Sequence, residues 1–220
     1  NCIEINIKDT YRNMKEIILK TKANLEKNNI TVFTAEKADE IPDIVKNLLK
    51  KGEVISCGGS VSLAECGVMD LLRCGEYDFI DRSKYADTRE AFLKSFDADT
   101  YFSSANALTE DGEIINVDGR CNRVAALLYG PKQIIYVIGA NKIVPDIVAG
   151  FKRVKEIAAP KNTVRLSCDT PCAKTGKCIS EETGKGCYSP QRICSGYVIS
   201  SFQREKDRVK VILCSESLGY

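Results

Sequence analysis

Polar side chains that can bind a ligand or transfer a proton crowd into residues 103–131, SSANALTEDGEIINVDGRCNRVAALLYGP. A short apolar run, Ile114–Val117, has an Asp-Gly pair on each side, and such pairs are typical of tight turns. A predicted helix, Cys121–Tyr129, follows the second pair, so the polar residues gather where strands pass into a helix. Ligands of open α/β sheets bind at such places. The candidate ligand-binding residues here are Asn106, Asn116, Gly119, Asn122 and Arg123, and the acid–base candidates are Asp111 and Asp118.

Each of these residues taken alone is also a common turn residue, because Asn and Asp side chains hydrogen-bond to nearby backbone. Turn geometry does not require Asn106, Asn122 or Arg123, however, so the cluster as a whole indicates a site. A guanidinium is well suited to clamp a carboxylate or phosphate. We therefore expect a small anionic ligand here.

A glycine turn, Cys57-Gly58-Gly59-Ser60, joins a predicted strand, Glu53–Ser56, to a predicted helix, Val61–Leu72. Unpaired backbone N–H groups at a helix start attract anions, and glycines let a ligand approach closely. The candidates are Gly58, Gly59, Ser60 and Ser62 for ligand binding, and Glu65, one turn further along, for acid–base work. The alternatives are a tight turn with a capping serine, and a solvated glutamate.

A lysine follows the most apolar strand of the sequence. Gln133–Ile138 (QIIYVI) predicts a fully buried strand, as in a parallel sheet. Lys142 stands just past its carboxyl end, where a cation can face a ligand. A solvated loop lysine is the alternative.

Residues 166–196, LSCDTPCAKTGKCISEETGKGCYSPQRICSG, hold five of the eleven cysteines. The segment has few large apolar residues, so something other than its own core must hold it together. Four thiolates can bind Zn²⁺ or an iron–sulfur cluster, and this spacing does not choose between them. We predict Cys172, Cys178, Cys187 and Cys194 as ligands, with Cys168 as the spare. The alternatives are a loop of free thiols, a single disulfide, or redox-active thiols.

The other cysteines have different expected roles. Cys66, Cys74 and Cys214 lie in apolar patterns and are predicted to be small core residues. Cys57 and Cys121 each stand next to a predicted helix start, where the pKa of a thiol is lowered, so either could be a nucleophile.

The composition limits the reaction mechanisms that are possible and indicates a cellular compartment. The 220 residues contain no His, which excludes mechanisms that use imidazole. Lys and Arg (32) nearly balance Asp and Glu (30), so the charge gives no reason to expect nucleic acid or a membrane as partner. No apolar run approaches the roughly 18 residues that span a bilayer, and no signal peptide is apparent. An odd, uneven set of eleven cysteines favours free thiols in a reducing compartment, the cytoplasm.

Alternating helices and short strands predict one α/β domain over residues 1–220, with a mainly parallel central sheet flanked by helices. Ile199–Gln203 and Arg208–Cys214 are predicted as a late β-hairpin around Glu205-Lys206-Asp207. The further helices expected are Tyr11–Asn28, Ala38–Lys51, Thr88–Phe96 and Pro145–Ile157, and the further strands are Ile30–Thr34, Tyr77–Ile80 and Thr100–Ser103.

Several long motifs resemble the LUD-domain family, the lactate utilisation proteins. They are ANALTEDGEIINVDGRCNRVAALLYGPKQIIYVIGANKIV, CGGSVSLAECG, TPCAKTGKC…CYSPQRIC and the closing VILCSESLGY, in order along nearly the whole chain. The resemblance implies a fold similar to the NagB/RpiA/CoA-transferase superfamily. Asn106 stands where related sugar-phosphate isomerases have an acidic residue, and Ile179–Gly186 separates two cysteines that are nearly adjacent in many family members.

The resemblance implies a component of L-lactate oxidation to pyruvate that acts with iron–sulfur redox subunits and binds a small anionic metabolite. Two alternatives stay open. One is a stand-alone enzyme on a sugar phosphate or an acyl-CoA-type substrate, and the other is a metal- or ligand-binding protein without turnover. The cofactor expected is an iron–sulfur cluster or zinc, and a second copy of the chain is a further expected partner, as a homodimer.

Overall fold

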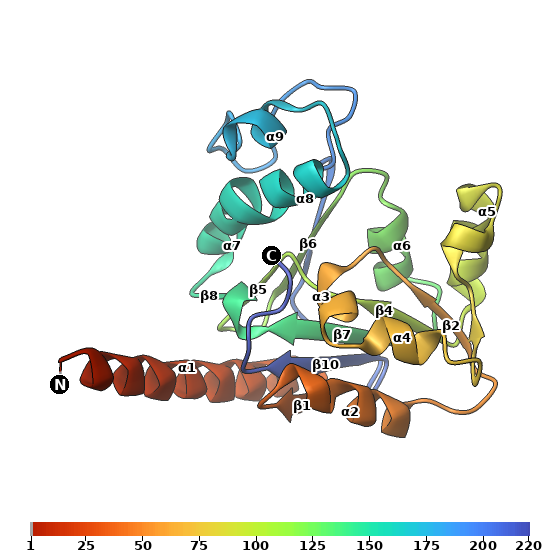
Figure 1. Cartoon of the computed structure of the whole chain (residues 1–220), viewed down its shortest axis with the longest axis horizontal. Coiled ribbons are helices and arrows are strands. Elements are labelled where there is room, and N and C mark those ends of the chain that lie inside the picture. The colour runs from red at the N-terminus through yellow and green to blue at the C-terminus, as the bar shows by residue number, and fades with distance from the viewer. Residues whose placement is uncertain (1) are drawn as a thin grey trace.

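The structure is a computed structural model that describes residues 2–220, with side chains described from residue 14 (Figure 1). The side chain of Tyr11, at the start of the first predicted helix, lies outside the described part. The helices are α1 Cys2–Lys27, α2 Ile41–Leu48, α3 Val61–Glu65, α4 Val68–Leu72, α5 Thr88–Lys94, α6 Asn122–Leu128, α7 Ile147–Arg153, α8 Ala159–Arg165 and α9 Pro171–Thr175. The strands are β1 Thr31–Ala35, β2 Val54–Cys57, β3 Asp78–Phe79, β4 Thr100–Ser103, β5 Ala107–Thr109, β6 Ile114–Asp118, β7 Gln133–Gly139, β8 Ile143–Val144, β9 Gly196–Ser200 and β10 Val209–Cys214.

The central sheet has six strands in the order β1-β10-β7-β4-β2-β3, and all its pairings are parallel. The predicted α/β class with a mainly parallel sheet is therefore confirmed. Strands β7 and β10 lie in the middle of the sheet, which explains their nearly continuous apolar sequences.

Helices cover both faces of this sheet, and the alternation of side chains along β7 shows the two layers. Ile134, Tyr136 and Ile138 belong to a core shared with α1 and α6. Ile135 and Val137 belong to a second core shared with α2, α3 and α4. Packing on both faces therefore fixes the ends of the strands, and residues that follow these ends can be held in place for a binding site.

A second, four-stranded sheet has the order β8-β5-β6-β9. The predicted tight turn at Asp111-Gly112 joins β5 to β6, and Gly112 has the positive φ of 91° that favours glycine there. Phe151 of α7 packs on this sheet. In Figure 1, α7, α8 and α9 lie together beyond this sheet, away from α1 and α2.

The predicted late hairpin is wrong. β9 pairs antiparallel with β6 in the second sheet, whereas β10 pairs parallel with β1 and β7 in the central one. The physical reason is burial: Val211 and Ile212 of β10 are both 0% exposed, so this strand needs cover on both faces. Strand β9 is only partly buried and lies at the edge of its sheet.

The predicted helix Val61–Leu72 is two short helices, because Gly67 adopts a left-handed conformation (φ 76°) between α3 and α4. The predicted helix Pro145–Ile157 instead begins at Ile147 and continues through a π-helical turn, Val154–Ala158, into α8. Among the described residues, no helix combines the length and the apolar character that crossing a bilayer requires.

Candidate functional site

A cavity of about 670 Å³ lies at the carboxyl edge of the central sheet, where β2, β4 and β7 end, and β6 of the second sheet ends beside it. This is the position that the strand order predicts for a ligand. The sequence-predicted residues that line it are Gly59, Ser60, Ser62, Asn106, Asp118, Gly119, Asn122, Arg123 and Lys142. Two more, Gly58 and Asn116, contact Arg123 from behind the lining.

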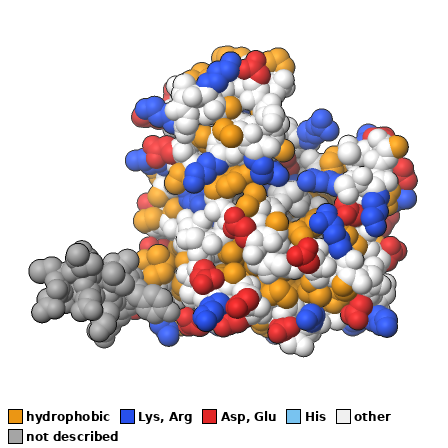
Figure 2. Space-filling view, in the orientation of Figure 1, with side chains coloured by type: hydrophobic (Ala, Val, Ile, Leu, Met, Phe, Trp, Pro, Cys, Tyr) orange, Lys and Arg blue, Asp and Glu red, His pale blue; other side chains and the backbone are white. Residues whose placement is uncertain are grey.

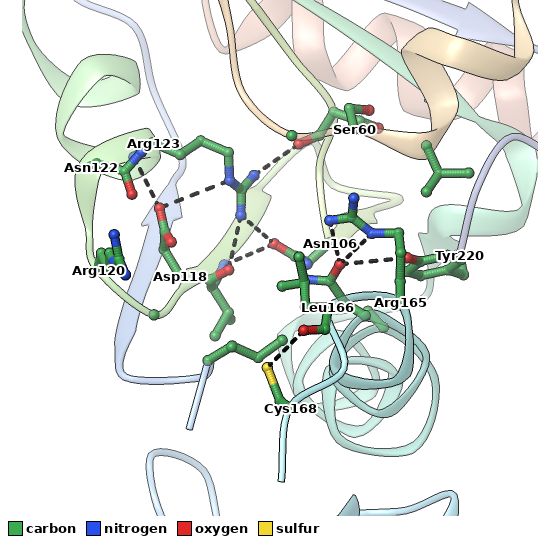
Figure 3. A pocket seen from close by; sticks show the side chains of 18 of the residues that line it. Ser60, Asn106, Asp118, Arg120, Asn122, Arg123, Arg165, Leu166, Cys168 and Tyr220 are labelled. Atoms are coloured by element: carbon green, nitrogen blue, oxygen red, sulfur yellow. Dashed lines mark hydrogen bonds and ion pairs between the residues drawn. The ribbon is translucent and has the colours of Figure 1, made fainter. Parts of the chain in front are cut away.

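Arg123 is the centre of the hydrogen-bond network in Figure 3. Its Nη1 donates to the backbone oxygen of Ser104 at 3.1 Å and to Oδ1 of Asn116 at 2.7 Å. Its Nη2 donates to Oδ1 of Asn106 at 2.9 Å and to the backbone oxygen of Val117 at 2.8 Å. Both terminal nitrogens are therefore saturated, because each has two hydrogens to donate. Arg123 adds positive charge to the cavity, but its geometry is that of a residue that fixes the ends of β4 and β6.

Asp118 supports the same frame. Its Oδ2 accepts hydrogen bonds from the backbone N–H of Arg123 at 3.0 Å and of Val124 at 3.3 Å, at the start of α6. The same oxygen lies 4.0 Å from Nε of Arg123. A carboxylate in this position stabilises the start of the helix and the guanidinium together.

The glycine turn makes room for arginines. A Cβ at Gly58 would lie 2.8 Å from Cδ of Arg123, and a Cβ at Gly59 would lie 2.8 Å from Nη2 of Arg82. The hydroxyl of Ser60 accepts from the N–H of Leu63 and caps α3, which has only five residues. The alternative of a tight turn with a capping serine therefore describes this segment better than an anion site at a helix start.

Lys142 lies in a 3₁₀ turn directly after β7, and it is only 3% exposed. Its Nζ donates to Oγ of Ser62 at 2.8 Å and to Oγ of Ser104 at 2.9 Å. Burial, followed by the charges of Arg153 and Arg123, lowers the pKa of this amine to about 7, against a smaller opposing effect of Glu65. Lys142 is thus a buried amine at the cavity wall and not a solvated loop lysine.

Four further arginines line the cavity and were not identified from the sequence: Arg82, Arg120, Arg165 and Arg192. They come from separate segments and share no motif, so no sequence signal marks them. Arg165 donates to Asn162, and Arg192 to backbone carbonyls. Within residues 14–220, the guanidinium groups of Arg82 and Arg120 make no hydrogen bond or ion pair, and Figure 3 draws Arg120 without one.

The lining is strongly cationic as a result. It contains Arg82, Arg120, Arg123, Lys142, Arg165 and Arg192, against a single lining carboxylate, Asp118. Figure 2 shows basic side chains around the hollow between the α8–α9 region and α5. Such a surface attracts anions, and its free guanidinium groups can form paired hydrogen bonds to a carboxylate or phosphate.

The remaining acid–base candidates lie elsewhere. Asp111 is in the turn between β5 and β6, where its backbone oxygen accepts from Asn28 near the end of α1. Glu65 accepts the N–H of Gly219 at 2.6 Å and does not line the cavity. The expected low pKa of the Cys57 thiol is wrong, since burial raises it to about 11. Cys121 is exposed, and Cys74, predicted in the core, is exposed as well.

The four predicted metal ligands come together. Cys172, Cys178, Cys187 and Cys194 line one small cavity of about 20 Å³, whereas Cys168 lines the large cationic one. Among the described residues no three Cys, Asp or Glu side chains are placed so that they could hold a metal ion. The metal assignment therefore stays a prediction.

Two cations hold the cysteine segment around these thiols. Nζ of Lys155 lies 3.9 Å from Sγ of Cys178 and donates to the backbone oxygens of Ser180 and Lys185. Nε of Arg192 donates to the backbone oxygen of Cys194 at 2.9 Å and lies 3.4 Å from its Sγ. Hydrogen bonds from two cations to backbone carbonyls thus hold the segment together in place of an apolar core.

Comparison with known proteins identifies relatives over most of the chain. The LUD domain family matches residues 18–214. A DUF162 family protein from Deinococcus radiodurans has a similar structure, with 17% sequence identity and a TM-score of 0.54, over 92% of this chain and 98% of that one. None of the curated proteins matches the sequence.

Two further solved structures are similar at lower scores. A translation initiation factor 2B from Pyrococcus horikoshii OT3 is 17% identical, with a TM-score of 0.36, over 50% of this chain and 48% of that one. Ribose 5-phosphate isomerase from Plasmodium falciparum is 12% identical, with a TM-score of 0.34, over 79% and 81%. Neither similarity carries an argument about the site.

Proposed function

The chain belongs to the LUD domain family, and from that premise we propose that it binds a small organic anion at the carboxyl edge of its central sheet. The observation that carries the proposal is the charge of the lining, six cations against one carboxylate. Of these cations, Arg82 and Arg120 keep their guanidinium donors free within the described part of the chain. They are the groups that a carboxylate would meet without breaking an existing hydrogen bond.

The metabolic role that we propose is in the oxidation of L-lactate or a similar organic acid to the keto acid, in the cytoplasm. It rests on the resemblance to lactate utilisation proteins. Oxidation of a hydroxy acid removes two electrons, and the Arg, Lys, Ser and Asn side chains of the cavity cannot accept them. We therefore propose that iron–sulfur redox subunits supply the electron acceptor.

A second candidate is a stand-alone enzyme acting on a sugar phosphate or an acyl-CoA-type substrate. The size of the cavity favours it, because about 670 Å³ is in the range of sites for larger metabolites and exceeds what lactate needs. Turnover by the isolated chain would support this candidate, and turnover only with redox subunits would support the first. Tight binding without turnover under either condition would instead indicate a binding protein.

Calorimetric titration with L-lactate, pyruvate, ribose 5-phosphate and coenzyme A tests the proposal. We expect saturable binding of at least one of these anions and a weaker complex for Arg120→Ala, by about tenfold to a hundredfold, the effect of losing a charged hydrogen bond. Arg204→Ala is the matched control, since Arg204 is exposed and does not line this cavity. Equal affinities for both variants and the parent chain would contradict the proposed site.

A further inference from the structure

The two buried lysines outside the N-terminal region differ in what their amines contact. Nζ of Lys155 donates to two backbone carbonyl oxygens, which can only accept hydrogen bonds. Nζ of Lys142 contacts the hydroxyl groups of Ser62 and Ser104. The Ser62 hydroxyl donates to the backbone oxygen of Leu218 and so accepts from the amine, whereas the Ser104 hydroxyl can either accept from the amine or donate to it. The surroundings of Lys142 therefore satisfy a neutral amine as well as an ammonium ion.

The charges around Lys142 favour the neutral form. Burial and the nearby Arg153 and Arg123 lower its pKa to about 7, whereas Glu65 raises it only slightly. Arg153 is itself held by the backbone oxygens of Asn141 and Asn106, so it stays close to the amine. Neutral primary amines are nucleophiles, and burial beside another cation is a known way to produce one.

The amine is also accessible to a bound molecule. Lys142 lines the large cavity together with both hydroxyl partners. It is held between the segments that follow β2, β4 and β7, all of which end at this edge. A ligand whose carboxylate lies against the free arginines would be in the same cavity as this amine.

We propose that Lys142 forms an imine with the carbonyl group of an α-keto acid bound in the cationic cavity. The inference rests on the proposed function, since it needs an organic anion in that cavity. The lone pair of Nζ attacks the carbonyl carbon and forms a C–N bond, while the carbonyl oxygen takes up a proton. The resulting carbinolamine then loses its hydroxyl group as water, and the C=N bond forms.

The serine hydroxyls have a defined part in this sequence. The Ser104 hydroxyl lies 2.9 Å from Nζ and can pass the proton that leaves the attacking nitrogen to the oxygen that departs as water. The Ser62 hydroxyl, which donates to the backbone oxygen of Leu218, accepts from the amine and holds it in place. No oxidant or reductant is needed, because amine and ketone combine with loss of one water. An imine withdraws electrons from the neighbouring carbon, which prepares a keto acid for proton loss or C–C cleavage there.

Reductive trapping with pyruvate tests the proposal. The full chain is incubated with pyruvate and sodium borohydride, and intact mass spectrometry followed by peptide mapping locates the adduct. We expect one pyruvate per chain, joined as the reduced secondary amine at Lys142. Lys142→Met should lose the adduct, and Lys152→Met, which removes an exposed lysine, should keep it.

Calorimetry with pyruvate on the same samples separates the two proposals. Binding of pyruvate without a trapped adduct at Lys142 would overturn the imine and leave the anion site standing. An equal adduct in the parent chain and in Lys142→Met would overturn it too, because surface lysines would then be the source. Neither binding nor adduct with pyruvate would overturn the imine, and the anion site would fall as well only if L-lactate, ribose 5-phosphate and coenzyme A also failed to bind.

Discussion

The two cavities of this protein are built in opposite ways. The large one is framed by strand ends of the central sheet, and each of its fixed side chains already has protein partners, as Arg123 does. The small one lies in a segment with hardly any core, whose loops are held by Lys155 and Arg192 and whose centre is lined by thiols. The first is thus framed by hydrogen bonds within the protein, whereas the second gathers four thiols that are not placed as the ligands of a metal ion. The predictions below test this difference.

The largest effect is expected at Arg123, which holds the frame of the large cavity. Arg123→Ala leaves Asn106, Asn116 and two backbone carbonyls without their donor and Asp118 without its cation. We expect the free energy of unfolding to fall by about 3–5 kcal/mol. Urea denaturation followed by circular dichroism measures it. A change below about 1 kcal/mol would mean that the frame does not depend on this guanidinium.

The metal predicted from the cysteine segment is tested at the small cavity. Its four thiols gather there but are not placed to hold an ion, so binding would have to draw them together, and of the two candidates we expect zinc, a single ion held by four thiolates. Protein purified without air should contain about one zinc per chain, and Cys187→Ser should lose most of it together with roughly 2–4 kcal/mol of stability. Elemental analysis and thermal melts provide the measurement.

The exposed Cys74 supplies the control, because Cys74→Ser should keep both the metal and the stability. Iron together with acid-labile sulfide would indicate an iron–sulfur cluster instead of zinc. The cysteine segment would then have to open to accommodate the cluster. Chains without metal, in which all four thiols react freely with a thiol reagent, would refute the assignment.

The two adjacent glycines distinguish the frame of the large cavity from its surface. A Cβ at Gly58 meets Arg123 and also approaches the Tyr101 hydroxyl to 3.3 Å, inside the packed frame. We expect Gly58→Ala to lower stability by about 1–3 kcal/mol. A Cβ at Gly59 meets only the flexible end of Arg82, so Gly59→Ala should change stability by less than about 0.5 kcal/mol.

Ligand binding also distinguishes the Gly58 and Gly59 variants. Gly59→Ala displaces the guanidinium of Arg82, and calorimetry should show a weaker complex with whichever anion the parent chain binds. The reverse pattern, a stable Gly58→Ala and an unfolded Gly59→Ala, would show that the frame and the surface are assigned the wrong way round.

The sequence predicted the fold well where hydrophobic pattern alone decides. Buried runs such as Gln133–Ile138 and turn signals such as Asp111-Gly112 are local, and the structure confirms both. The partner of β9 was missed because the choice between a hairpin and a distant strand depends on burial across the whole sheet. For the same reason the sequence could not find Arg82 or Arg192, which reach the cavity from segments far apart in the chain.

Roles were harder to predict than positions. Residues of the polar cluster do lie at one edge, but Asp118 and Asn106 are used to hold Arg123, which sequence reasoning took for the ligand clamp. Hydrogen bonds between side chains decide such roles, and they are visible only when the packing is known. Lys142 shows the same point in reverse: its place after a buried strand predicts a ligand-facing cation with a solvated loop lysine as the alternative, and its burial decides against the loop lysine.

A stabilising effect is expected for Lys142→Met, and its size depends on pH. The pKa of Lys142 is about 7 in the folded chain, below its usual value of 10.5. At a pH between these two pKa values, the unfolded chain binds more protons than the folded one. The stability of the parent chain should therefore rise as the pH increases from 7 towards 10. Methionine removes the cost of burying the amine and should stabilise the protein by about 1–2 kcal/mol at pH 6, less the hydrogen bonds lost by Ser62 and Ser104.

Urea denaturation at pH 6, 7, 8, 9 and 10 measures this dependence. The gain of Lys142→Met over the parent chain should be largest at pH 6 and shrink steadily above pH 7. Lys155→Met is the control, because it removes hydrogen bonds to the carbonyls of Ser180 and Lys185 and should be destabilising at every pH. Parallel curves for the parent chain and Lys142→Met would mean that Lys142 stays charged in the folded protein. The large cavity would then hold a fixed cation there in place of a neutral amine, and its wall would attract an anion without supplying a nucleophile.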